Sequence, residues 1–165
     1  MKPWSPRIGV QAAPFDAAAE AERLTEGRTD IGAVVSFVGL CRDEGGSLAA
    51  LELEHYPGMA EHAIEAIARQ AAERWPLEGL TVIHRHGRIA PGEPIVLVLA
   101  ASAHREAAFE AASFLMDFLK TSAPFWKKEH RRDAGPGGWV AAKASDDAAA
   151  GRWARAAEGP DQVRR

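Results

Sequence analysis

Lysines gather at a point of the sequence where they could bind and activate an anion. The stretch "FLKTSAPFWKKEH" places Lys120, Lys127 and Lys128 around a proline and two aromatic residues. Lys120 ends an apolar helical pattern, so we expect its aliphatic stem to be buried and its ammonium group held in place. The proline that follows predicts a turn, with Lys127 and Lys128 on one short loop. A lysine held this way can act as an acid, a base or a nucleophile, although a solvated basic loop explains the spacing more simply.

Two further basic positions stand at the ends of predicted core elements. "SAHR" (102–105) lies where a buried strand passes into a helix, and the backbone N–H groups of a helix start attract anions. His104 and Arg105 would complete such a site, although capping of the helix by Ser102 or His104 explains the residues equally well. "FVGLCR" ends another buried strand with Arg42, which can also be an ordinary surface charge. Together, the three basic spots favour a local anion site.

Metal and thiol chemistry are weaker hypotheses. His84 and His86 lie on one face of a predicted strand and His55 lies on another strand, but no nearby cysteine or carboxylate completes a ligand set. We therefore expect no metal. Cys41 stands beside Arg42 and could be an activated thiolate. A cysteine at a strand end is more often inert, and that is our expectation here.

The elements that must position these residues are short strands and separate helices. "IGAVVSFVGL" is so unbroken that it predicts a strand buried on both faces. The helix over 104–120 is apolar on nearly all sides, which predicts burial against more than one neighbour and favours a second subunit. We expect an α+β fold with a single domain over 1–153 and a flexible tail over 154–165. The predicted strands are 7–11, 31–40, 51–56, 80–87, 95–102 and 138–144, and the helices are 14–24, 59–75, 104–120 and 146–159.

Composition limits the possible partners. The 165 residues carry 20 Lys and Arg against 23 Asp and Glu, a formal net charge of −3, so no global basic field attracts nucleic acid or a membrane. The single cysteine excludes an internal disulfide and a multi-cysteine zinc site. No signal peptide is visible, and no window reaches the roughly 18 apolar residues of a spanning helix. We expect a soluble cytoplasmic protein whose anion binding is local.

Several stretches together carry a resemblance to a known family. "GAVVSFVG", "LELEHYPGM", "RWPL", "VIHRHGRIAPGE", "SAHREAAFEA" and "FLMDFLKTSAPFWKKE", in this order, closely resemble the large, catalytic subunit of molybdopterin synthase, the MoaE family. The resemblance runs from about Gly32 to Trp153. It implies a MoaE-like α/β hammerhead fold that forms a homodimer and acts as a sulfurtransferase in molybdenum cofactor biosynthesis, with no cofactor of its own.

The resemblance also implies partners. Each subunit would bind a small ubiquitin-like sulfur carrier, MoaD-like, whose C-terminal Gly-Gly carries a thiocarboxylate, so that the homodimer is the core of a heterotetramer. The carrier's tail would enter a pocket and deliver sulfur to cyclic pyranopterin monophosphate. Two deliveries would make the dithiolene of molybdopterin. No metal is needed, because the sulfur arrives already activated.

The family's site residues carry over by position. Lys120 and Lys127 match its two pocket lysines and are the implied catalytic residues. Lys143 stands where some relatives have arginine and offers a point charge instead of a bidentate contact. The resemblance assigns no role to the thiol of Cys41, in the variable pair of "FVG-x-x-R". The residues implied to bind substrate are Phe37, Leu40, Cys41, Arg42, His104, Arg105, Met116, Lys128, Glu129 and Lys143.

Two other functions stay open at this point. A non-catalytic module that binds a ubiquitin-like tail would need the same cationic pocket, and only consumption of pyranopterin separates it from the enzyme. A nucleic-acid binder that uses "KKEHRR" is weaker, because this loop has no wider basic face interleaved with aromatic residues.

Overall fold

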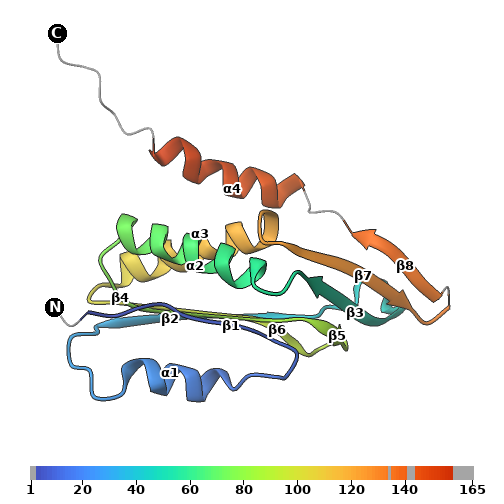
Figure 1. The fold of residues 1–165 in the computed structure, drawn as a ribbon, viewed down its shortest axis with the longest axis horizontal. Helices are drawn as coiled ribbons and strands as arrows, with labels where there is room; N and C mark the ends of the chain where they lie inside the picture. Colours follow the sequence, from blue (N-terminus) through green and yellow to red (C-terminus); the bar gives the residue numbers. More distant parts are fainter. Residues whose placement is uncertain (1–2, 134, 141–143, 158–165) are drawn as a thin grey trace, which may run out of the picture.

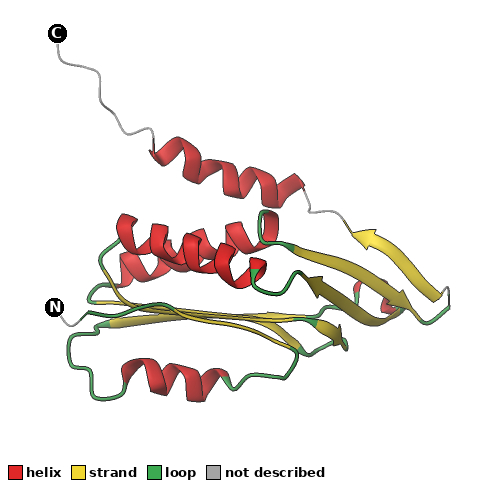
Figure 2. Cartoon of the chain, in the orientation of Figure 1, coloured by secondary structure: helices red, strands yellow, loops and turns green. Residues whose placement is uncertain are grey.

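The computed structural model of the chain describes residues 3–133, 135–140 and 144–157 (Figures 1 and 2). Within these ranges the chain has the predicted α+β fold, built on two four-stranded sheets. In chain order the elements are β1 (Arg7–Gln11), α1 (Ala17–Thr25), β2 (Ala33–Leu40), the short 3-10 helix η1 (Glu44–Gly46), β3 (Leu48–His55), α2 (Met59–Arg74), β4 (Leu77–Arg85), β5 (Gly87–Ile89), β6 (Pro94–Ser102), α3 (Arg105–Thr121), β7 (Phe125–Arg131), β8 (Gly135–Val140) and α4 (Ala144–Ala157).

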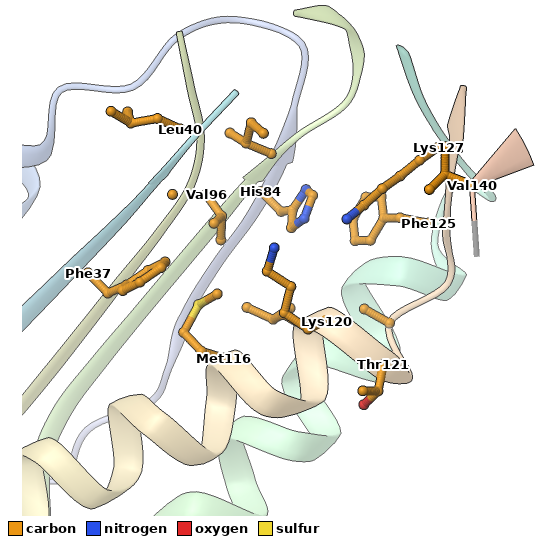
Figure 3. A pocket seen from close by; sticks show the side chains of 14 residues that line it. Phe37, Leu40, His84, Val96, Met116, Lys120, Thr121, Phe125, Lys127 and Val140 are labelled. Carbon is orange, nitrogen blue, oxygen red and sulfur yellow. The ribbon is translucent and has the colours of Figure 1, made fainter. Parts of the chain in front are cut away.

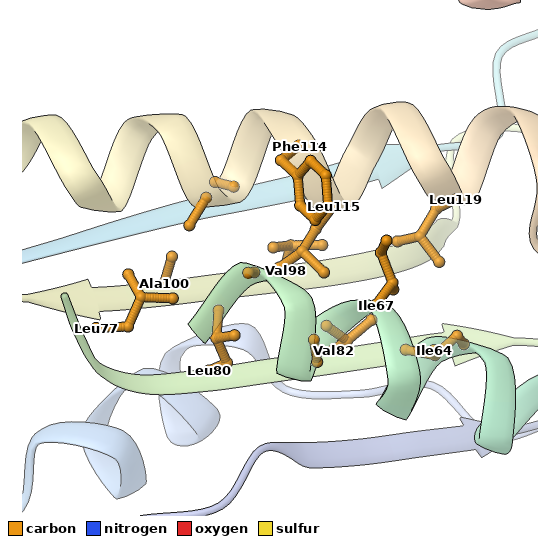
Figure 4. Close-up of a cluster of buried hydrophobic side chains, with 14 of the residues drawn as sticks. Ile64, Ile67, Leu77, Leu80, Val82, Val98, Ala100, Phe114, Leu115 and Leu119 are labelled. Carbon is orange, nitrogen blue, oxygen red and sulfur yellow. The ribbon is translucent and has the colours of Figure 1, made fainter. Parts of the chain in front are cut away.

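The first sheet carries the main hydrophobic core. Its strand order is β1-β4-β6-β2, with β1 parallel to β4 and the other pairs antiparallel. The helices α2 and α3 cover one face of this sheet and α1 covers the other (Figure 1). β4 and β6 lie in the middle of the sheet, so nearly all of their residues are buried. Figure 4 shows the side chains between α2, α3 and these strands, among them Ile64, Ile67, Val82, Val98, Leu115 and Leu119.

Local signals place the starts of the helices. At α1 the carboxylate of Asp16 accepts a hydrogen bond from the Ala19 backbone N–H at 3.0 Å and so caps the start of the helix. Before α2, Gly58 adopts φ 84°, a left-handed conformation that glycine reaches without strain. The Glu61 carboxylate then accepts from the Gly58 N–H at 2.9 Å and ties the turn to the helix.

The second sheet extends beyond one end of the first, in the order β5-β3-β7-β8 (Figure 1). Its strand β7 corrects the prediction that residues 125–131 form a loop. Antiparallel pairing with β3 on one side and β8 on the other makes this segment a strand. These partners are distant in sequence, so the local turn residues that predicted a loop did not reveal them.

The strand β2 corrects a second prediction. We expected burial on both faces, but in the single chain β2 is an edge strand that pairs with β6. Its large apolar side chains Val34, Phe37, Val38 and Leu40 are 37–56% exposed. Among the described residues, this continuous apolar run is therefore left partly uncovered.

The helix α3 also leaves apolar surface uncovered. Phe114 and Leu115 are buried, whereas Phe109 on another side of the helix is 60% exposed. The helix α4 packs across α3, where Trp153 donates its indole N–H to the Asp117 carboxylate at 2.6 Å. The predicted last helix is thus confirmed.

The last helix reaches the end of the described residues. Residues 154–157 continue α4, in agreement with the helix predicted over 146–159, and the flexible tail over 154–165 stays a prediction. Residues 158–165 lie outside the described part of the chain, and the single domain over 1–153 stays a prediction. In the part of the chain that the structure describes, no helix has both the length and the apolar character needed to span a membrane.

Candidate functional site

A narrow cavity opens where the C-terminal end of α3 meets both sheets (Figure 3). Its volume is about 190 Å³, below the roughly 300 Å³ at which pockets for small molecules usually begin. Strands from the two sheets and the last turns of α3 all contribute to its walls. The lining residues are Phe37, Gly39, Leu40, His84, Ile95, Val96, Met116, Leu119, Lys120, Thr121, Ala123, Phe125, Lys127 and Val140.

Lys120 reaches this cavity from the last turn of α3. The helix ends at Thr121, where the Ser122 N–H donates to the Phe118 carbonyl at 2.8 Å and the Ala123–Pro124 sequence disfavours another helical turn. A cation at a helix C-terminus is favoured by the helix dipole. The predicted burial of the Lys120 stem is wrong, because this last turn lies at the cavity mouth and leaves the residue exposed. The ammonium group still points into the cavity (Figure 3).

Lys127 reaches the same cavity from β7. Side chains alternate along a strand, so Phe125 and Lys127 face the cavity while Lys128 points to the opposite face, in register with Glu52 of β3. A three-residue turn from α3 to β7 thus brings together two lysines that are seven positions apart. Lys127 and Lys128 are both half-buried on a paired strand, so the solvated loop is not what the structure forms.

His84, at the end of β4, is a third titratable residue of the cavity. It is 6% exposed, and its ring stacks on Phe125 at 3.9 Å between centroids and 14° between planes. Nδ1 lies 2.8 Å from the Arg85 carbonyl oxygen. Burial lowers the pKa of His84 to about 4, the hydrogen bond to Arg85 opposes this, and the charges of Lys127 and Lys120 add to the lowering. The imidazole is therefore neutral at physiological pH.

The apolar part of the wall contains three of the predicted substrate-binding residues. Phe37 and Leu40 approach from β2, and Met116 lies one turn before Lys120 on α3. These side chains form an apolar wall on one side of the cavity into which the lysine ammonium groups point (Figure 3). A charge in such surroundings interacts more strongly with a bound anion than it would in water.

Four other predicted residues do not line the cavity. Cys41 is 2% exposed and packs in a small core of the second sheet, where its Sγ lies 3.9 Å from the Ile89 carbonyl oxygen. Burial raises the pKa of the Cys41 thiol, which favours the inert thiol over the activated thiolate. The others are Arg42, which pairs with Glu44, Lys128, on the opposite face of β7, and Glu129, which pairs with Arg131.

His104 and Arg105 lie far from the lysines in one chain. They stand at the start of α3, and 16 residues at a rise of about 1.5 Å place His104 roughly 24 Å from Lys120. The His104 side chain makes no capping hydrogen bond, so capping does not explain it. Both residues are exposed. Lys143, the last predicted contact, lies outside the described residues.

The other histidines form a separate contact. His86 lies beside His55 with ring centroids 4.3 Å apart, while His84 turns to Phe125 and the cavity. No three His, Cys, Asp or Glu side chains of the described ranges gather in a way that could hold a metal ion. Sequence reasoning considered His84 only as a metal ligand and missed its place in the cavity. Its position at the polar end of a buried strand was the available signal.

Comparisons with known proteins agree on one family. Residues 10–122 match the family model described as MoaE protein. The molybdopterin synthase catalytic subunit of Mesorhizobium japonicum is 68% identical over 154 residues, 93% of this chain and 97% of that protein. The molybdopterin biosynthesis MoaE protein from Burkholderia ambifaria has a TM-score of 0.78 and 47% identity, over 90% of this chain and 98% of that one. Molybdopterin synthase from Staphylococcus aureus has a TM-score of 0.71 and 30% identity, over 80% and 95% of the two chains. The chain belongs to the MoaE family.

Proposed function

We propose that this chain is the catalytic subunit of a molybdopterin synthase and acts as a sulfurtransferase. It would move sulfur from the C-terminal thiocarboxylate of a small ubiquitin-like carrier to cyclic pyranopterin monophosphate. One observation carries the proposal: Lys120 and Lys127 converge on a single narrow cavity in a protein whose net charge is −3. Thiocarboxylate and cyclic phosphate are both anions, so a site for the two must be cationic even where the whole protein is not.

The shape of the cavity supports the carrier tail as one ligand. A volume of about 190 Å³ is small for a whole pyranopterin but admits an extended Gly-Gly segment, which has no side chains. Phe37 and Met116 would exclude water along the tail. The thiocarboxylate would then reach Lys120 and Lys127, whose ammonium groups point inward (Figure 3).

The reaction can be written with these two lysines. The thiocarboxylate sulfur attacks a side-chain carbon of the pterin, a C–S bond forms, and the C–O bond to the cyclic phosphate breaks with the phosphate oxygen as leaving group. Water then cleaves the resulting thioester, so that the carrier leaves as a carboxylate and the sulfur stays on the pterin. Lys120 would stabilise the oxyanion of this acyl step, and Lys127 would hold the phosphate. A second carrier would deliver the second sulfur.

A phosphate-holding role for His104 and Arg105 requires a second copy of the chain. The length of α3 keeps them roughly 24 Å from Lys120 in one chain. The open edge of β2 and the exposed Phe109 offer apolar surface for a homodimer. We expect an interface above roughly 1,000 Å², as stable pairs require. One carrier on each subunit would complete a heterotetramer.

Reconstituted sulfur transfer tests the proposal. Purified protein, thiocarboxylated carrier and cyclic pyranopterin monophosphate should yield molybdopterin, detected by mass. Lys120→Ala should slow turnover about 10²–10³-fold, as the loss of one preorganised oxyanion contact typically does, while carrier binding and circular dichroism stay unchanged. Lys128→Ala is the matched comparison, because this lysine lies on the opposite face of β7, and its loss should be far smaller.

Two outcomes would contradict the proposal. Carrier binding without any consumption of pyranopterin would favour a non-catalytic module for a ubiquitin-like tail. Turnover of Lys120→Ala within about threefold of wild type, on the scale of 10²–10³ expected for such a contact, would remove Lys120 from the mechanism.

A further inference from the structure

We propose that His84 is a positioning residue for Lys120: its neutral imidazole offers a hydrogen-bond acceptor to the Lys120 ammonium group, which points toward it, and so sets the direction of that group in the cavity (Figure 3). This inference rests on the proposed sulfur transfer and adds a residue to that site.

The ring of His84 is held in one orientation. It is nearly fully buried and stacks on Phe125, and Nδ1 lies 2.8 Å from the Arg85 carbonyl oxygen. A carbonyl oxygen can only accept, so Nδ1 carries the proton of the neutral ring. Nε2 is therefore left with a lone pair, and His84 is one of the residues that line the cavity. The fold thus fixes both the tautomer and the direction of an acceptor.

The two lysines approach this acceptor from different elements. Figure 3 shows the Lys120 ammonium group pointing from α3 toward the His84 ring, and the Lys127 ammonium group ending beside Phe125. Among the described lining residues, these three are the titratable ones. Two ammonium groups in one small cavity repel each other. A neutral acceptor in front of Lys120 gives that ammonium group a defined direction, which a lysine with a flexible stem does not have by itself.

The acidity of His84 favours a positioning role over a proton relay. Burial first, and then the charges of Lys127 and Lys120 with a smaller contribution from His55, lower its pKa to about 4. At pH 7 such a group is protonated in only about one molecule in a thousand. It therefore keeps its lone pair available but accepts a proton too weakly to serve as an efficient base. An acceptor for the Lys120 ammonium group, and not a proton transfer, is what His84 contributes in this proposal.

Kinetics of matched variants test this role. His84→Phe keeps a ring against Phe125 but removes the acceptor, and we expect kcat of sulfur transfer to fall about tenfold to a hundredfold, the range that misplacement of a catalytic group produces. KM for the carrier should change by less than about threefold, because the substitution alters the chemical step and not the binding of the carrier. His84→Gln restores an acceptor near the position of Nε2 and should recover part of the rate. His86→Phe, two residues further along and in contact with His55, should keep wild-type kcat.

A double-mutant cycle separates positioning from packing. If His84 acts through Lys120, then His84→Phe should change the residual rate of Lys120→Ala by less than about twofold, because neighbours that act as one unit are not additive. A full additional loss in the double variant would overturn the proposal. So would a His84→Phe rate equal to wild type, or a His84→Gln rate as low as that of His84→Phe with both variants folded.

Nitrogen-15 NMR of the imidazole provides a readout that does not depend on turnover. Wild-type protein should show the Nδ1–H tautomer, and Lys120→Met should shift the Nε2 resonance and raise the pKa of His84, because a nearby positive charge has been removed. If wild type transfers no sulfur, the proposed function fails, yet this spectrum still decides whether the two side chains touch. An Nε2 chemical shift that is the same in wild type and Lys120→Met would refute the contact between the two side chains.

Discussion

Acid should destabilise this protein through His84 before its carboxylates are protonated. The pKa of His84 is about 4 in the folded chain against an ordinary 6.5, so between these values the unfolded chain binds more protons. The contribution of His84 is therefore complete above pH 6.5 and is lost as pH falls toward 4. The difference, 6.5 − 4, multiplied by about 1.4 kcal/mol per pH unit, gives about 3–4 kcal/mol in all, of which about 2 kcal/mol is lost between pH 7 and pH 5.

The window from pH 7 to pH 5 lies above the range in which the paired carboxylates titrate. The pKa values of Glu20 and Glu52 are lowered by their hydrogen bonds to Arg7 and His130, so those pairs lose their contribution only below about pH 4.5. His86 has a pKa lowered by burial and contributes in the same direction as His84. A comparison with a variant that retains His86 is therefore needed.

Urea unfolding at pH 7, 6 and 5 measures the effect. Protomer concentration is held constant, because an oligomer's apparent stability depends on it. Wild type should lose about 2 kcal/mol over this range from His84, and His84→Gln should lose correspondingly less. His86→Phe should keep the larger part of the wild-type slope. Equal slopes for wild type and His84→Gln would show that His84 is not buried as a neutral ring.

Two other predictions follow from buried and exposed surface. Cys41→Ser should leave sulfur transfer close to wild type, since the thiol lies in the core of the second sheet and the sulfur comes from the carrier; a persulfide on Cys41 in mass spectrometry would instead indicate a cysteine relay. The wild type should scatter light as a dimer at micromolar concentration, and Val38→Glu on the exposed face of β2 should give a monomer with wild-type circular dichroism. A wild-type monomer would refute the dimer, and a Val38→Glu dimer of unchanged affinity would place the dimer interface away from β2.

Elements whose signals are local were predictable. The helices predicted over 14–24, 59–75 and 104–120 are set by neighbouring residues, such as the Asp16 cap of α1 and the glycine before α2, and the structure confirms these helices. β7 was missed because its strand character comes from β3 and β8, which pair with it from distant parts of the chain. β2 was predicted to be a strand, but its exposure depends on its edge position, and sequence alone does not state strand order.

The same difference between local signals and distant contacts explains which residues of the cavity could be predicted from the sequence. Lys120 and Lys127 belong to consecutive elements joined by a short turn, so their meeting could be anticipated from one stretch of sequence. His84 arrives from β4 and Phe37 from β2, and only the order β1-β4-β6-β2 beneath α3 brings them to that stretch. Neighbouring residues thus supply the charge of the cavity, and the fold supplies its walls and its acceptor. A substitution that moves the end of β4 should therefore also slow sulfur transfer, although it lies outside the lysine stretch.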